Sequence, residues 1–181
     1  FSIMSELRTN RIVPRDGLTS GASGGIVQIV SIQKSDMFTW NVNGDVAITG
    51  MSVSITPTRS DSKVLVQVQI GANGTTSAVY PIFWQLYKNG SQISGAKGSG
   101  SAGASDPVKC ATYTKNYVYY TGTSTSFSFL DSPATTSSTT YTLYAQRHAS
   151  GGTGYFNATG KQINERYAET ISTITAMEVS G

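Results

Sequence analysis

The sequence predicts an all-β fold, an antiparallel β-sandwich of jelly-roll type, and three observations support this prediction. The chain is rich in strand and turn residues, with 25 Ser, 23 Thr and 19 Gly among its 181 residues. Apolar and polar residues alternate in many short runs, whereas no segment shows the apolar spacing of an amphipathic helix. These runs are separated by turn residues, and short strands of this kind are typical of sandwiches and jelly rolls.

The clearest strand is Lys63–Ile70, in which every second residue is apolar. Gln67 and Gln69 point to the opposite face, toward water or a neighbouring subunit. This arrangement predicts a strand with one face in the core. The residues on that core face are Val64, Val66, Val68 and Ile70.

The run before this strand changes its parity at Gly50. Val46 and Ile48 stand at even positions, whereas the apolar residues after Gly50 stand at odd positions. A β-bulge at Gly50 would return both groups to the core, because an extra residue reverses the side to which the following side chains point. The second group consists of Met51, Val53 and Ile55.

Seven further runs have the composition of strands, and the Asn89-Gly90 dipeptide predicts a hairpin with a type I′ turn. Trp84 shares a face with Ile82 and Leu86, which places its indole in the core. The last run is partly apolar on both faces, as expected of a central strand or of one at a subunit interface. The seven ranges are Gly25–Gln33, Tyr80–Tyr87, Val108–Tyr120, Ser126–Leu130, Tyr141–Arg147, Gly154–Asn157 and Thr170–Val179.

Residues 1–24 differ from the rest of the chain. Their apolar residues are sparse and are interrupted by Pro14, by Asp16-Gly17 and by the glycines that begin at Gly21. Such a segment cannot bury much of its own surface. We expect an extended N-terminal arm over residues 1–24, which attaches to other subunits or proteins, and one β-sandwich domain over residues 25–181.

Charge and hydropathy exclude two classes of partner. The net charge is only +3 and no Lys/Arg block follows Arg15, so we expect no nucleic-acid binding. No apolar run approaches the roughly 18 residues of a membrane span, so we expect no membrane insertion.

Residues suited to catalysis or metal binding are few. Most of the ten acidic residues stand in turns, where side-chain capping explains them, although two of them could still converge as in a glycosidase. His148 is the only histidine, Cys110 is the only cysteine, and the chain contains no nucleophile-elbow motif. No loop has the oxygen spacing of a dedicated Ca²⁺ site. We therefore expect a non-enzymatic protein with no cofactor and no metal.

Four blocks of sequence occur in order along the chain. They are Arg11–Gly17 with Gly24–Val30, Thr49–Pro57 with Ser62–Val66, Phe129–Thr136 with Thr139–Leu143, and Ile171–Val179. Together they resemble the tail-fibre and virion surface proteins of marine bacteriophages, of the small trimeric β-sandwich type. The resemblance implies a homotrimer on the virion surface and supplies no catalytic residues. It does not cover residues 71–125.

The function expected from this resemblance is host attachment. The sandwich would be the head of a tail or attachment fibre that binds a host-surface glycan or an outer-membrane receptor, while the arm contacts other virion proteins. A capsid decoration protein with no receptor role is the main alternative. A glycan depolymerase is a third possibility.

The expected recognition site lies in the segment that the resemblance does not cover. Residues 94–107 form a loop rich in Gly and Ser, and a cluster of tyrosines follows it. Exposed tyrosines stack on sugars while neighbouring amides and hydroxyls bind the hydroxyl groups. The alternative is that the tyrosines line the core or a trimer interface. The candidate receptor-binding residues are Lys97, Tyr113, Lys115, Tyr117, Tyr119 and Tyr120, with Tyr155 in addition.

Overall fold

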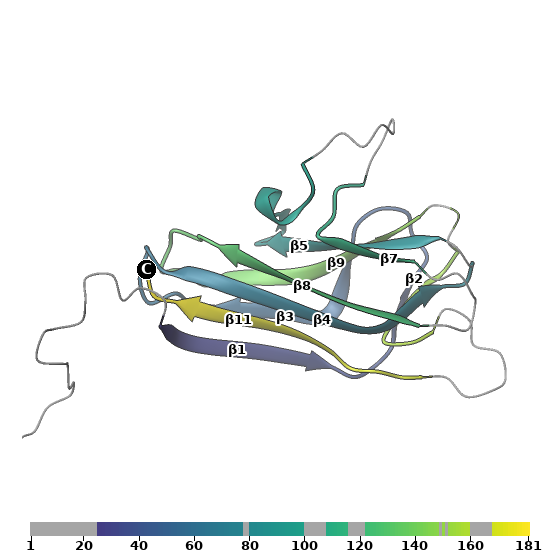
Figure 1. The fold of residues 1–181 in the computed structure, drawn as a ribbon, viewed down its shortest axis with the longest axis horizontal. Helices are drawn as coiled ribbons and strands as arrows, with labels where there is room; N and C mark the ends of the chain where they lie inside the picture. The colour runs from purple at the N-terminus through teal and green to yellow at the C-terminus, as the bar shows by residue number, and fades with distance from the viewer. Residues whose placement is uncertain are drawn as a thin grey trace, which may run out of the picture.

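The fold is an all-β sandwich, as predicted. In the computed structural model, the described residues form eleven strands, arranged in two antiparallel sheets packed face to face, and one short 3-10 helix, η1 (Ser94–Ala96) (Figure 1). The first sheet contains β1 (Ile26–Lys34), β2 (Phe38–Trp40), β4 (Lys63–Thr75), β8 (Thr123–Asp131), β10 (Gly154–Phe156) and β11 (Ser172–Val179). The second contains β3 (Val46–Ile55), β5 (Pro81–Lys88), β6 (Ser91–Gln92), β7 (Thr112–Lys115) and β9 (Thr139–Arg147). The structure describes residues 25–77, 80–99, 108–115, 122–148, 150, 152–159 and 168–181.

The strand pairing has the pattern of a jelly roll. Eight of the described strands have four or more residues. Among these eight, β1 pairs with β11, β3 with β9, β4 with β8 and β5 with β7. The first strand is thus paired with the last, the second with the second last, and so on inward, as in one long hairpin that has been rolled up. β11 lies between β1 and β4, which confirms that the C-terminal strand is central. The predicted arm, residues 1–24, lies outside the described residues.

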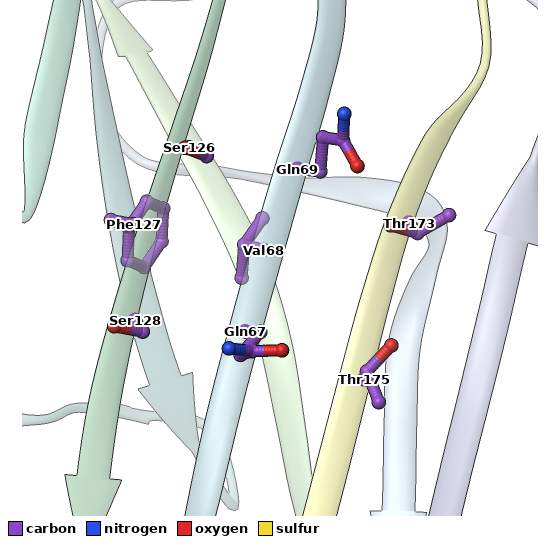
Figure 2. A pocket seen from close by; sticks show the side chains of 8 residues that line it. All are labelled: Gln67, Val68, Gln69, Ser126, Phe127, Ser128, Thr173 and Thr175. Carbon is purple, nitrogen blue, oxygen red and sulfur yellow. The ribbon is translucent and has the colours of Figure 1, made fainter.

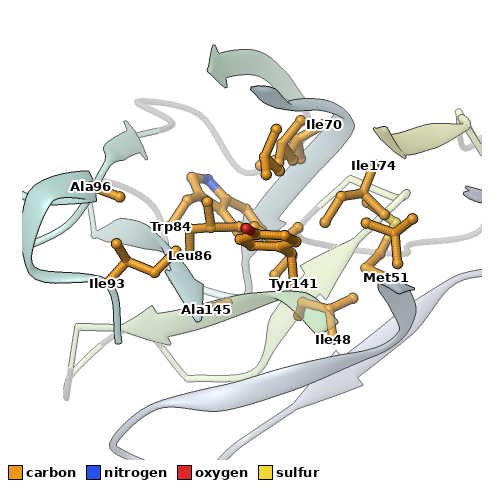
Figure 3. Packing of buried hydrophobic residues seen from close by; sticks show 14 of the residues in the cluster. Ile48, Met51, Ile70, Trp84, Leu86, Ile93, Ala96, Tyr141, Ala145 and Ile174 are labelled. Carbon is orange, nitrogen blue, oxygen red and sulfur yellow. The ribbon is translucent and has the colours of Figure 1, made fainter. Parts of the chain in front are cut away.

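The core lies between the two sheets (Figure 3). In β4 the four predicted core residues are at most 2% exposed, whereas Gln67 and Gln69 are exposed. Trp84 is fully buried, as predicted, and its ring lies edge-on to Phe156 at a centroid distance of 5.8 Å. Its indole N–H donates to the Thr114 hydroxyl at 3.0 Å. Burial of each large apolar side chain stabilises the fold by about 1.5–3 kcal/mol.

The bulge predicted at Gly50 is confirmed. The register of β3 against β9 changes between the pairs Ala47–Tyr144 and Ser52–Thr142, so five steps along β3 match two steps along β9. Gly50 has a φ of +85°, a conformation that favours glycine. The odd number of extra residues reverses the parity, and Ile48 and Met51 both point into the core.

The other strand predictions hold with two exceptions. The turn at Asn89 and Gly90 has φ angles of +48° and +81°, which confirms the type I′ hairpin. The predicted strand Val108–Tyr120 begins too early, because the carbonyl of Cys110 accepts a hydrogen bond from Gly98 and β7 starts only at Thr112. The three-residue strand β2 was not predicted, since its alternation is too short to recognise.

Two buried carboxylates are held by hydrogen bonds. Asp131 in β8 accepts from the Tyr141 hydroxyl at 2.7 Å and from the Lys88 ammonium at 2.8 Å, which ties the first sheet to the second. Glu178 in β11 is fully buried and accepts from the Gln28 amide at 2.6 Å and from the backbone N–H and the hydroxyl of Thr58, both at 2.7 Å. Burial alone would raise the pKa of Glu178, but these hydrogen bonds outweigh it and lower the pKa to about 2 from an ordinary 4.5.

Candidate functional site

The outer surface of the second sheet carries several aromatic side chains that do not enter the core. Ile82, Trp84 and Leu86 of β5 point inward, so the residues between them point outward. The same alternation places Tyr144 of β9 and Tyr113 of β7 on this surface. We call it the aromatic face, and it consists of Asp45, Phe83, Gln85, Tyr87, Gln92, Lys97, Tyr113 and Tyr144.

Two ring pairs lie across neighbouring strands of the aromatic face. Tyr87 and Tyr144 stack with a centroid distance of 3.8 Å and an interplanar angle of 19°. Phe83 and Tyr113 lie 6.5 Å apart in a tilted arrangement. Tyr113 is 62% exposed, and the other three rings are half-buried. The ring of Tyr113 is therefore accessible to a ligand, and Phe83 lies beside it.

A chain of hydrogen bonds runs across the same face. The Gln85 amide donates to Asp45 Oδ1 at 2.5 Å, and the Tyr87 hydroxyl donates to the other oxygen of Asp45. The Gln92 amide donates to Gln85 Oε1, and Lys97 Nζ donates to Gln92 Oε1 at 2.8 Å. This chain fixes the orientation of the exposed Asp45 carboxylate and of the half-buried Gln92 and Lys97 side chains, while the Gln85 amide that joins them is itself buried. The groups at its accessible ends are suited to binding hydroxyl groups.

The environment of Tyr87 keeps its hydroxyl protonated. Burial and the hydrogen bond to the Asp45 carboxylate raise the pKa of Tyr87 well above its ordinary value of 10. The phenol therefore remains a donor to Asp45 at any physiological pH. The face has a stable pattern of donors and acceptors, and the group is not poised for proton transfer.

The structure brings three of the predicted recognition residues to this surface. Tyr113 belongs to the aromatic face itself, and Lys97 joins it through Gln92. Lys115 is exposed two residues after Tyr113 on the same side of β7, opposite Pro81. Tyr155 does not join them, because it lies in β10 of the first sheet between Thr39 and Gly74. Tyr117, Tyr119 and Tyr120 lie outside the described residues.

Sequence reasoning missed the remaining members of the aromatic face. Asp45, Gln85, Tyr87 and Tyr144 stand on strands that are distant in the sequence and meet only through the sheet pairing. One signal was available. Tyr87 stands at an odd position, whereas the core residues Trp84 and Leu86 stand at even positions. Tyr144 directly follows the core residue Leu143 and so points to the opposite side of its strand. Both tyrosine rings therefore had to point away from the core.

The outer surface of the first sheet is different in kind. A shallow groove of about 750 Å³ crosses β8, β4 and β11 (Figure 2). The side chains that point outward along it are short hydroxyls and two amides, and none is charged. They are Gln67, Gln69, Ser126, Ser128, Thr173 and Thr175.

The structure also describes the surroundings of His148 and Cys110, two residues with possible catalytic chemistry. His148 stacks on Tyr80 at a centroid distance of 4.8 Å, and its Nδ1 accepts from the N–H of Ser150 at 3.2 Å. Burial raises the pKa of the Cys110 thiol, which disfavours the reactive thiolate. Within the described ranges, no three His, Cys, Asp or Glu side chains gather closely enough to hold a metal ion. The described part of the chain also contains no helix long and apolar enough to cross a membrane.

Comparison with known proteins adds no assignment to this geometry. The chain matches no protein-family model, and no curated protein is significantly similar to it. The function has to be inferred from the residues and from the two outer faces.

Proposed function

We propose that the chain is the head domain of a bacteriophage attachment fibre, a non-catalytic virion surface protein that binds a host-surface glycan through the aromatic face. The observation that carries the proposal is the exposed ring of Tyr113, which lies against Phe83 on the same outer surface as a hydrogen-bonded row of amides and a carboxylate. Sugars present apolar C–H faces and hydroxyl groups together, and this surface offers a partner for each.

The mode of binding follows from the side chains. A sugar ring would stack on Tyr113, while its hydroxyls bond to groups at the edge of the hydrogen-bonded chain, such as Lys97 and Asp45. Tyrosine has few rotatable bonds, so little conformational entropy is lost when it is ordered by a ligand. Contacts of this kind are weak singly, and a homotrimer would present three copies to one cell surface and gain avidity.

The virion location rests on the four sequence blocks described above, which resemble phage surface proteins. A jelly roll is compatible with this role and does not by itself indicate it, because one fold serves many functions. In the proposed particle, residues 1–24 contact other virion proteins, and the sandwich faces outward.

Binding of the full-length chain to an array of bacterial surface polysaccharides tests the proposal. We expect Tyr113→Ser to weaken binding at least tenfold with no change in the circular dichroism spectrum. Tyr155→Ser is the matched control, because that tyrosine lies in the other sheet, and it should bind like the wild type. Equal binding by the wild type and Tyr113→Ser would remove the aromatic face from the recognition site.

Two other functions make different predictions. A capsid decoration protein would appear on the shell in a virion reconstruction, and not at the tip of a fibre. A depolymerase would release shorter sugars from the polysaccharide that it binds. An attachment head should be found on a fibre and should leave the polysaccharide intact.

A further inference from the structure

The outward side chains of β1, β11, β4 and β8 form continuous rows across the first sheet. One row is apolar, where Ile29 pairs with Met177, Met177 with Leu65 and Leu65 with Leu130. The next two rows contain only hydroxyls and amides. We call these three rows the hydroxyl face: Ile29, Met177, Leu65 and Leu130; Ser31, Thr175, Gln67 and Ser128; Gln33, Thr173, Gln69 and Ser126.

The apolar row is exposed to solvent in the single chain. Ile29 is 59% exposed and Leu130 is 49% exposed, at the two edges of the row. Ile26 and Val27 extend the apolar surface along β1 with 58% and 48% exposure. Large apolar side chains that gather on one surface mark a contact with another molecule more often than scattered ones do.

The hydroxyl face also lacks charge. None of its members is ionisable, and the nearest outward charge in the described part of these strands is Lys63 at the start of β4. The aromatic face, by contrast, contains Asp45 and Lys97, with Lys115 beside it. Depletion of charge is the compositional mark of the centre of a protein interface.

The lack of charge also indicates what kind of molecule covers the face. In a closed symmetric oligomer, residues near the symmetry axis meet their own copies. A charged residue there would meet its own sign, so an uncharged face is favoured around the axis. The face offers a sugar no ring to stack on, because no aromatic side chain points outward from its described residues and Phe127 and Phe129 pack toward the core.

We propose that the hydroxyl face is the subunit interface of a homotrimer, where it is covered by the same face of second and third copies of this chain. This inference rests on the trimer included in the proposed function and assigns its contact surface. The apolar row contributes burial, and the hydroxyl and amide rows supply hydrogen bonds without charge. The aromatic face, on the opposite side of the sandwich, then remains exposed on the outside of the assembly.

Sedimentation of the full-length chain at micromolar concentration tests this interface. We expect the wild type to have the mass of three chains of 19.2 kDa. Gln67→Glu changes almost nothing except charge, and Ile29→Glu places a charge in the apolar row at a position that the single chain leaves exposed. Both should weaken association at least tenfold while the circular dichroism spectrum is retained. Gln146→Glu, the same change on the outer side of β9 in the second sheet, should remain trimeric.

A measurement on the wild type avoids the risk that a variant misfolds. Ile29 and Tyr113 have nearly equal exposed fractions in the single chain, 59% and 62%. Hydroxyl-radical labelling, normalised for each residue to the unfolded chain, should therefore be low at Ile29 and high at Tyr113. Equal labelling of the two residues would overturn the proposal.

Three sedimentation results would also overturn the proposal: a monomeric wild type, trimers that persist in both face variants, or dissociation caused by Gln146→Glu alone. The attachment function is tested separately on the polysaccharide array. A trimer with the hydroxyl face covered but no affinity for polysaccharide would leave the interface standing and contradict the attachment function. A monomer that binds polysaccharide would support the attachment function and overturn the proposed interface.

Discussion

The two outer faces of the sandwich are made by the same backbone pattern and carry opposite chemistry. Each lies on a sheet whose inward side chains contribute to the shared apolar core. On the aromatic face, the outward side chains are large and bonded to one another, from Lys97 through Gln92 and Gln85 to Asp45. On the hydroxyl face they are uncharged, in one apolar row and two rows of hydroxyls and amides. The core fixes the fold, and the outward positions are free to specify a contact.

This difference leads us to assign a separate role to each face. A flat, neutral surface suits a partner that repeats the same surface, because neither copy repels the other. A surface with rings and fixed polar groups suits a ligand with a defined shape and pattern of hydroxyls. Substitutions that disturb both faces, or only one of them, can test this division.

Trp84→Ala should have the largest effect and should disturb both faces at once. The indole fills the space between the sheets and packs against Trp40 and Phe156. Its loss should reduce the free energy of unfolding by about 3–5 kcal/mol, measured by urea denaturation. Trp84→Ala should therefore weaken both polysaccharide binding and trimer formation. If only one of the two were weakened, the two sheets would be less coupled than the shared core implies.

Glu178→Gln should act mainly on the first sheet. The new amide would direct a donor at the donating amide of Gln28, so the free energy of unfolding should fall by about 1.5–3 kcal/mol near pH 7. The measurement is urea denaturation at pH 7. Glu178→Gln should weaken the association of the subunits strongly. The trimers that still form should bind polysaccharide with an affinity that is reduced less.

The pH dependence of stability should identify the same carboxylate. Since the pKa of Glu178 is about 2 in the folded chain and ordinarily 4.5, its contribution is fully present above about pH 4.5 and is lost as the pH falls toward 2. Thermal unfolding between pH 7 and pH 2 should show this loss in the wild type. The Glu178→Gln variant should show a flatter profile, and parallel profiles would contradict the low pKa.

Gly50→Val tests the bulge in β3, which directs the apolar side chains on both sides of Gly50 into the core. A β-branched residue at a φ of +85° is strained, and we expect a loss of about 1–3 kcal/mol in the free energy of unfolding. Val42→Thr is a control at an exposed position outside both faces and should change stability little. A Gly50→Val protein as stable as the wild type would show that β3 can follow another path.

Tyr87→Phe should have the smallest effect on stability and should act on the aromatic face alone. It removes one donor from Asp45 and leaves the ring stack with Tyr144 in place. The expected loss is about 0.5–1.5 kcal/mol, with affinity for polysaccharide reduced and the trimer unchanged. A dissociated trimer would place the aromatic face in the subunit interface and reverse the comparison.

The core was predictable from the sequence because burial imposes a period of two. The alternation in Lys63–Ile70, the parity change at Gly50 and the Asn89-Gly90 turn each identified a local feature correctly. The stacked pair Tyr87–Tyr144 was not predictable in the same way, since it depends on which strands become neighbours. Tyr155 was grouped with the other tyrosines on residue type alone, and the fold places it in the other sheet.

The pairing of the first long strand with the last has a consequence for how the molecule forms. Residues that meet in β1 and β11, such as Ile29 and Met177, are separated by almost the whole domain. Such non-local pairing slows folding to roughly milliseconds to seconds. During synthesis, β1 emerges early and has no partner until the final strand leaves the ribosome. Over that interval the backbone N–H and C=O groups of β1 that later pair with β11 are open to aggregation, so yield in a heterologous host should depend on chaperones.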